Sequence, residues 1–121
     1  MTADAALTSS IEALSDGAAI LVLSGEIDMA TAPKMVSRFQ ELADKGLTSV
    51  IVDAREVRFI DSTGLHGLTE GKRIIHEKGS QIVLVPSAQV SRLLELVFPG
   101  KLFATRVETM DEALEILSVK D

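Results

Sequence analysis

The sequence predicts an α/β fold in which helices cover a mainly parallel sheet, and three observations lead to this prediction. Apolar runs of strand length occur at residues 18–24, 49–53 and 81–85. Each run is followed by a segment with apolar residues at helical spacing, and glycine-containing turns separate these segments. Such alternation of strands and helices is typical of parallel strands joined by right-handed crossovers.

The chain of 121 residues is expected to form a single domain, residues 1–121, in which residues 1–4 are a flexible N-terminus. The sheet is expected to contain about four or five strands, with about four helices around it. Its first two strands, residues 5–14 and 18–24, are predicted to form an N-terminal β-hairpin through the turn Ser15-Asp16-Gly17.

The first helix is expected to follow the second strand directly. Residues 25–28 close that strand, Thr31 or a neighbour caps the helix, and Pro33 lies in its first turn. Gly46 is expected to end the helix. Its buried face is predicted to consist of Met35, Val36, Phe39, Leu42 and Ala43.

Residues 57–71, V-R-F-I-D-S-T-G-L-H-G-L-T-E-G, hold the main junction between a strand and a helix. The strand at residues 49–52 leads through residues 53–58 into the extended pair Phe59 and Ile60, and a helix over residues 62–78 follows Asp61. Asp and Ser are favoured at a helix start because their side-chain oxygens accept hydrogen bonds from first-turn N–H groups. We therefore expect an exposed hydroxyl at Ser62, where the helix dipole favours an added phosphate by about 0.3–1 kcal/mol.

Three glycines, Gly64, Gly67 and Gly71, recur at helical spacing in that helix. Each interior glycine costs roughly 0.5–1 kcal/mol relative to alanine, so three of them require an explanation. Either the helix packs closely on its own sheet, or the backbone of a partner approaches the end that carries Ser62.

The remainder of the chain is predicted to form a strand, two helices and a short edge strand. Ser87 starts a helix that residues 98–100 break, and residues 102–106 form the edge strand. Thr109 and Glu112 form a capping box at the start of the last helix. The residues expected to be buried in the two helices are Val90, Leu93, Leu94 and Val97, then Ala113, Leu114, Ile116 and Leu117.

Two acidic groups and a hydroxyl are expected on one rim of the sheet. Asp28 and the pair Asp61-Ser62 each follow a strand, and partners of parallel sheets meet the loops at the carboxyl ends of the strands. Helix capping is the simpler explanation for both aspartates. Spacing alone does not separate capping from a functional site.

Composition excludes several classes of function. The net charge is −6 and no basic run occurs, which argues against direct nucleic-acid binding. The chain has no cysteine, which excludes thiol catalysis, zinc–thiolate sites and disulfides. It shows neither a signal peptide nor an apolar run of the ~20 residues that a membrane helix needs, so we expect a cytoplasmic protein without membrane insertion.

Catalysis by this chain is not expected. Asp61, Ser62 and His66 suggest a hydrolytic triad, but Ser62 and His66 are one helical turn apart and no G-x-S-x-G elbow precedes them. His66 and His76 lack the additional ligands that a metal site requires, and no phosphate-binding glycine motif is present. A small serine hydrolase therefore remains a minor alternative.

The run Gly25-Glu26-Ile27-Asp28, followed later by F-I-D-S-T-G-L at residues 59–65, resembles the STAS domain family (sulfate transporter and anti-sigma factor antagonist). It is more closely similar to the stand-alone bacterial anti-sigma factor antagonists. The resemblance covers nearly the whole chain in length and order of elements, including V-P-S at residues 85–87. D-S-T-G-L after an apolar strand is the specific part of the pattern.

The resemblance implies a binding module that phosphorylation switches. In that family the serine matching Ser62 is phosphorylated by the anti-sigma factor, an ATP-dependent serine kinase of the GHKL ATPase type. The unphosphorylated antagonist binds this kinase and frees the sigma factor, and a PP2C-type phosphatase restores the binding form. Asp28 is implied to assist recognition or phosphorylation, and the kinase supplies ATP, so we expect no cofactor in this chain.

The sequence departs from the family at His66, where a small residue is common, so an imidazole is expected near the docking surface formed with Asp61, Thr63 and Gly64. His66 tunes the choice of partner or indicates a less typical one. Thr63 provides a second, less favoured acceptor hydroxyl. The main alternative is a stand-alone STAS subunit that regulates a lipid or anion transporter complex.

Overall fold

The computed structural model describes residues 6–14, 17–98 and 105–119. The predicted flexible N-terminus at residues 1–4, the turn residues 15 and 16, and residues 99–104 of the helix break and edge strand lie outside this part. The elements are β1 (Thr8–Ala13), β2 (Ala18–Ile27), α1 (Ala32–Asp44), β3 (Ser49–Ile60), α2 (Ser62–Glu77), β4 (Gln81–Pro86), α3 (Ala88–Val97) and α4 (Met110–Val119).

The described strands form one four-stranded sheet in the order β1-β2-β3-β4. β1 and β2 pair antiparallel as a hairpin, whereas β2 pairs with β3 and β3 with β4 in parallel. The predicted α/β class, the mainly parallel sheet and the N-terminal hairpin are therefore confirmed.

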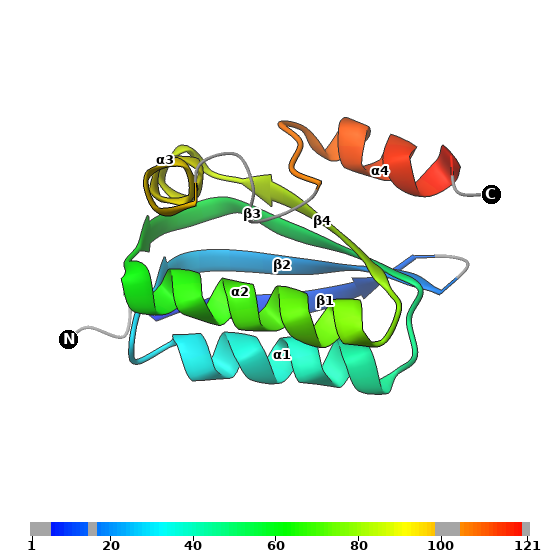
Figure 1. Cartoon of the computed structure of the whole chain (residues 1–121), viewed down its shortest axis with the longest axis horizontal. Coiled ribbons are helices and arrows are strands. Elements are labelled where there is room, and N and C mark those ends of the chain that lie inside the picture. Colours follow the sequence, from blue (N-terminus) through cyan, green and yellow to red (C-terminus); the bar gives the residue numbers. More distant parts are fainter. Residues whose placement is uncertain (1–5, 15–16, 99–104, 120–121) are drawn as a thin grey trace.

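Helices cover both faces of the sheet (Figure 1). α1 and α2 lie side by side on one face, and α4 lies on the other. Side chains alternate between two cores along each central strand: Val50 and Val52 of β3 join the larger core with Phe39 and Leu68, whereas Ile51 joins the smaller core beneath α4.

Two strands are longer than predicted. β2 continues through Gly25 to Ile27, and β3 runs without interruption from Ser49 to Ile60. The two strands accommodate this length by register shifts between Val22 and Ser24 and between Gly25 and Glu26. Gly25 has φ +113°, which only glycine adopts readily, and a Cβ there would lie 2.5 Å from the Ala6 carbonyl oxygen. The glycine that was expected to close β2 instead permits an irregularity within it.

Two side chains predicted to be buried are not. Val97 is 45% exposed because α3 reaches the core through Val90, Leu93 and Leu94, and Val97 is its last residue. Leu114 is 38% exposed because it follows the fully buried Ala113, one residue around the helix, and so falls at the border of the apolar face. The other expected core residues of α3 and α4 are buried or partly buried.

The predicted edge strand is represented in the described residues by a single parallel bridge between Leu84 of β4 and Arg106. The Leu84 N–H donates to the Thr105 carbonyl at 3.1 Å, and the Val107 N–H donates to the Leu84 carbonyl at 3.0 Å. The capping box after it is confirmed, because Glu112 N–H donates to Thr109 Oγ1 (3.1 Å) and Thr109 N–H donates to Glu112 Oε1 (3.2 Å).

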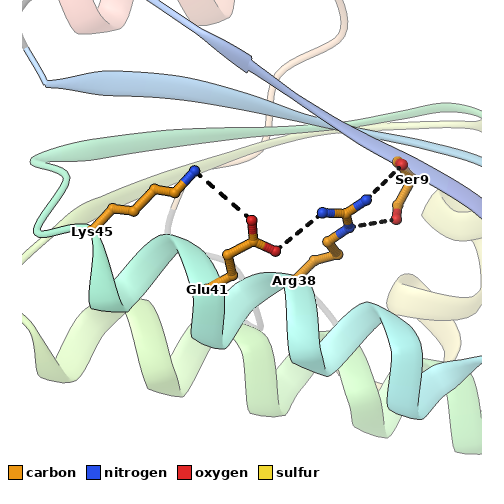
Figure 2. Close-up of polar contacts among 4 residues, drawn as sticks. All are labelled: Ser9, Arg38, Glu41 and Lys45. Carbon is orange, nitrogen blue, oxygen red and sulfur yellow. Dashed lines mark hydrogen bonds and ion pairs between the residues drawn. The ribbon is translucent and has the colours of Figure 1, made fainter.

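The other edge of the sheet, β1, is tied to α1 by one arginine (Figure 2). Arg38 donates from Nε to Ser9 Oγ at 3.0 Å and from Nη2 to the Ser9 carbonyl at 3.3 Å. Glu41 accepts from Arg38 and also pairs with Lys45. Arg38 thus occupies a carbonyl of an edge strand, which would otherwise be open to pairing with another chain.

The glycine stripe of α2 is buried, which decides between its two explanations. A Cβ on Gly67 would lie 3.0 Å from the end of Met35, and one on Gly71 would lie 2.3 Å from the Phe39 ring. The stripe therefore allows close packing, chiefly on α1 rather than on the sheet. Packing within the domain thus accounts for the three glycines without the other explanation, a partner's backbone at the Ser62 end.

No helix in the described part of the chain combines the length and the apolarity needed to cross a membrane.

Candidate functional site

The carboxyl ends of β2 and β3 meet at one rim, as predicted. Ile27 and Ile60 are register partners at the ends of these strands, and Asp28 and Asp61 follow them directly. The Asp61 N–H donates to the Ile27 carbonyl at 3.3 Å, which joins the start of α2 to the end of β2. Two acidic residues therefore come together although 32 positions of sequence separate them.

Asp61 caps α2 and positions Ser62. Its backbone is extended (φ −111°, ψ −174°), and its Oδ1 accepts from the Gly64 N–H at 2.8 Å. Ser62 and Thr63 are the first two helical residues, and both are exposed. In the described part of the chain, their N–H groups find no carbonyl partner, as is usual in the first turn of a helix.

Asp28 organises the turn between β2 and α1. Its Oδ1 accepts from the N–H groups of Ala30 (2.9 Å) and Thr31 (3.1 Å). The Thr31 hydroxyl accepts from the Asp28 N–H at 2.9 Å and lies 2.8 Å from the Glu26 carbonyl oxygen. Thr31 is the N-cap residue of α1, but its side chain makes no capping hydrogen bond. The carboxylate of Asp28 binds the N–H groups of Ala30 and Thr31 just before the helix, so this aspartate has a structural role in the turn.

Gly64 lies beneath the rim and not on it. The glycine is buried, and a Cβ built on it would come within 2.4 Å of the Ile27 carbonyl oxygen. Its Cα thus packs against the end of β2, and its contribution to a partner-binding surface stays a prediction. Its N–H serves the capping bond to Asp61.

His66 lies one helical turn after Ser62 on the exposed side of α2. Glu70 follows after another turn, and its pKa is lowered chiefly by the hydrogen bond from Arg73. The charges of Arg73 and His66 lower that pKa further, and partial desolvation opposes them. The exposed surface of α2 next to Ser62 thus carries an imidazole followed by a cluster of paired charges, since Arg73 also binds Glu77 at 2.6 Å.

Two exposed apolar side chains beside the rim were not singled out from the sequence. Met29, in the turn after Asp28, is 75% exposed, and Phe59, two residues before Asp61, is 46% exposed. Successive side chains of a strand point to opposite faces, and Ile60 enters the core. This alternation in β3 could have predicted that Phe59 is exposed. Exposed large apolar residues next to a candidate site are candidate contacts for a protein partner.

The geometry does not assemble a hydrolytic or metal site on this rim. In the described part of the chain, the Ser62 hydroxyl has no hydrogen bond to an imidazole or a carboxylate, which a serine nucleophile needs for activation. No three His, Asp or Glu side chains of residues 6–14, 17–98 and 105–119 gather as potential metal ligands. The rim offers an exposed hydroxyl, two carboxylates engaged in backbone hydrogen bonds and a helix N-terminus.

The family model of the STAS domain matches residues 12–113. The match spans most of the chain, so the protein belongs to the STAS domain family, as the resemblance of its motifs implied. A comparison with curated proteins finds no match.

Solved structures with the same fold include several anti-sigma factor antagonists. One from Mycobacterium paratuberculosis is 26% identical, with a TM-score of 0.80 and complete coverage of both chains. The antagonist SpoIIAA in its unphosphorylated form is 18% identical, with a TM-score of 0.75 and coverage of 93% of this chain and 97% of that chain. The Bacillus cell fate determinant SpoIIAA in its phosphorylated form is 18% identical, with a TM-score of 0.69 and coverage of 91% and 99%. At 18% identity the similarity concerns the fold alone.

Proposed function

We propose that this protein is an anti-sigma factor antagonist whose unphosphorylated form binds a serine-kinase anti-sigma factor and releases the sigma factor. Phosphorylation of Ser62 switches this binding off. The observation that carries the proposal is the position of Ser62: its side chain is exposed at the first residue of α2, beside Asp61 and the Asp28 turn. A kinase can reach such a hydroxyl without unfolding any element of the domain.

The comparisons support this proposal at the level of the family. The structure from Mycobacterium paratuberculosis that matches the entire chain is of an anti-sigma factor antagonist, and SpoIIAA has been solved in both phosphorylation states. The proposed partner is a GHKL-type kinase that brings its own ATP, so the proposal assigns no cofactor to this chain. A PP2C-type phosphatase would return the protein to its binding form.

Electrostatics explains how one phosphate could act as a switch. A phosphate adds about −1.5 to −2 charges at pH 7. At Ser62 it would lie at the positive end of α2, near first-turn N–H groups that lack a carbonyl partner, so the fold itself should tolerate the charge. The same phosphate would lie close to Asp28 and Asp61, which increases the negative potential of the rim.

A protein surface that is complementary to the unphosphorylated rim would not tolerate that added charge. Unfavourable charge juxtaposition at an interface can cost several kcal/mol. Since each ~1.4 kcal/mol changes affinity tenfold, a loss of two or more orders of magnitude requires no conformational change. We therefore propose a switch that acts on the interface and not on the fold.

Asp28 has a second role in this proposal. The exposed turn that it organises adjoins the start of α2, so its charge and its turn would help the kinase to recognise the acceptor. Asp28→Asn keeps the side-chain oxygen that accepts from Ala30 and Thr31 but removes the charge. We expect this variant to retain its stability and to be phosphorylated more slowly.

The decisive experiment is incubation with a candidate anti-sigma kinase and ATP, followed by intact-mass measurement and peptide mapping. The proposal predicts one phosphate on Ser62 in the wild type, none in Ser62→Ala, and normal phosphorylation of Thr63→Ala. Absence of phosphate, with the same kinase active on another antagonist, would contradict the proposal for that partner. Binding to a transporter complex without phosphorylation would instead favour the role of a STAS transporter subunit.

A further inference from the structure

An open cavity of about 310 Å³ lies at the opposite end of α2 from Ser62. Its walls come from the last two turns of α2, the connection to β4, the first residues of β4 and Thr105. At 1.5 Å per residue, the 16-residue helix separates the cavity from the Ser62 hydroxyl by about 20 Å. The cavity is therefore a different site from the rim.

Two nitrogen-bearing side chains on the α2 wall of the cavity can donate hydrogen bonds to a ligand. Lys72 and His76 lie one helical turn apart on α2 and both face the cavity. Among the described residues, neither side chain forms a hydrogen bond or an ion pair with the protein. No carboxylate is among the described residues that line the cavity, although acidic residues outnumber basic ones in the chain. The cavity thus combines unengaged donors with a local absence of negative charge.

Gln81 provides an independent observation. This residue lines the cavity at the first position of β4, and its Oε1 is buried without any hydrogen-bond partner in the described part of the chain. Native proteins rarely leave a buried acceptor unpaired, and each exception calls for a ligand, a water or a functional role. Because Gln81 also lines the cavity, its unpaired oxygen is a candidate acceptor for a ligand hydroxyl or amine.

The surrounding backbone is fixed. The Ser80 hydroxyl donates to the Leu47 carbonyl, and the Gln81 N–H donates to the Thr48 carbonyl at 3.0 Å. The Thr105 carbonyl is held by the Leu84 N–H, so its side chain stays beside β4. The β4 side of the cavity therefore loses little conformational freedom when a ligand binds, and the ordering cost falls on the side chains of Lys72 and His76.

We propose that this cavity binds a small organic anion that also carries a hydroxyl or amine donor. Lys72 and His76 bind the anionic group, and Gln81 accepts a hydrogen bond from the donor. The volume lies at the lower end of ligand pockets, which favours a ligand smaller than a nucleotide. The anionic group is a phosphate ester or a carboxylate, which have the same recognition chemistry here.

The test is an NMR titration of the backbone amides of the full chain at constant ionic strength, without kinase. Glycerol 3-phosphate and 3-hydroxybutyrate represent the two anionic groups, and inorganic phosphate and ATP serve as comparisons. We expect saturable shifts at residues 79–82, at Thr105 and around Lys72 with at least one of the two organic anions. Which of them binds more tightly decides between the phosphate ester and the carboxylate.

Three variants test the residues. Loss of the charge in Lys72→Gln should weaken binding about tenfold, and Gln81→Met should weaken it about threefold while the spectrum remains that of the folded protein. Lys78→Gln is the matched control, because Lys78 caps the same end of α2 but does not line the cavity. This variant should bind as the wild type does.

Several results would overturn the proposal. Shifts that do not saturate, or that centre on the Ser62 end of α2, would show that the cavity is not the binding site. Equal binding of inorganic phosphate would reduce it to a site for an adventitious ion only. Tighter binding of ATP would refute the proposal that the ligand is smaller than a nucleotide. Equal weakening by Lys72→Gln and Lys78→Gln would show that the anion is attracted by the general positive charge of this end of α2 and not by a specific site. None of these results depends on whether Ser62 is phosphorylated.

Discussion

The Cα of Gly64 lies so close to the carbonyl oxygen of Ile27 that a Cβ on the glycine would approach that oxygen to 2.4 Å. The contact joins the first turn of α2, which begins at the exposed Ser62, to the last residue of β2. The position of the acceptor thus depends on a residue without a side chain, held against the backbone of a neighbouring strand.

Gly64→Ala should therefore destabilise the domain by about 1–3 kcal/mol, because a backbone atom cannot yield as a side chain can. Gly67→Ala is the matched control, since its Cβ would meet the end of the Met35 side chain at 3.0 Å and Ala32 Cβ at 3.2 Å. In that variant the gain of up to ~1 kcal/mol in helix propensity should offset much of the strain. Chemical denaturation measures both variants, and equal losses would refute the explanation.

Two substitutions of Asp61 separate the effect of its capping hydrogen bond from the effect of its negative charge. Asp61→Ala removes the acceptor for the Gly64 N–H and should cost about 0.5–2 kcal/mol of unfolding free energy. Asp61→Asn keeps an oxygen in the same position and should remain close to the wild type. If the two variants unfold at the same denaturant concentration, the capping bond does not contribute as described.

Charge at Ser62 should control binding to the kinase. Ser62→Ala is expected to bind with the affinity of the wild type, and Ser62→Asp about tenfold or more weakly, because the kinase surface that fits the unphosphorylated rim does not tolerate an added negative charge. Calorimetry with the kinase measures both affinities. Thr63→Asp controls for charge in the same helical turn and should weaken binding to the kinase less than Ser62→Asp does. Equal affinities of Ser62→Ala and Ser62→Asp would contradict the switch.

His66 should influence which kinase is bound. Replacement by alanine leaves stability within about 0.5 kcal/mol, because the imidazole is exposed. We expect His66→Ala to bind its own kinase more weakly and to gain affinity for a kinase whose own antagonist has a small residue there. Binding assays with both kinases measure this difference, and unchanged affinity for both would exclude a role for His66 in partner choice.

Glu70 should titrate below its ordinary pKa of 4.5 because Arg73 donates a hydrogen bond to it. A carboxyl group whose pKa is lower in the folded state stabilises the fold above its unfolded pKa, and this contribution disappears as the pH falls through the folded pKa. Arg73→Gln should move the pKa of Glu70 back upwards, whereas Lys78→Gln should not. Carboxyl chemical shifts recorded against pH measure the change, and an unmoved pKa in Arg73→Gln would refute its cause.

Sequence reasoning succeeded where the signal was local. The Asp61 cap, the capping box of Thr109 and Glu112, and the Ser87 cap, whose Oγ accepts from the Val90 N–H at 3.2 Å, each depend on residues within one helical turn. The meeting of Asp28 and Asp61 was also predicted, since parallel strands place their carboxyl ends on one rim.

It failed where the outcome depended on distant contacts. Gly25 was expected to end a strand, but pairing with β3 carries the strand past it. Val97 and Leu114 have the helical spacing of core residues, but nothing in that spacing reveals how far the neighbouring elements extend. Exposed Phe59 and the cavity at Gln81 were likewise not predicted, because both arise from the relative positions of elements.

The sequence by itself determined the class of fold, the order of its elements, the family and the exposed serine at the start of α2, because periodicity and capping act over a few neighbouring residues. Only the tertiary structure decided what lies against each surface. It placed the glycine stripe of α2 against α1 and Ile27, and it gathered Lys72, His76 and Gln81 around a cavity. Such contacts join residues that are distant along the chain, and close packing of the folded core selects them.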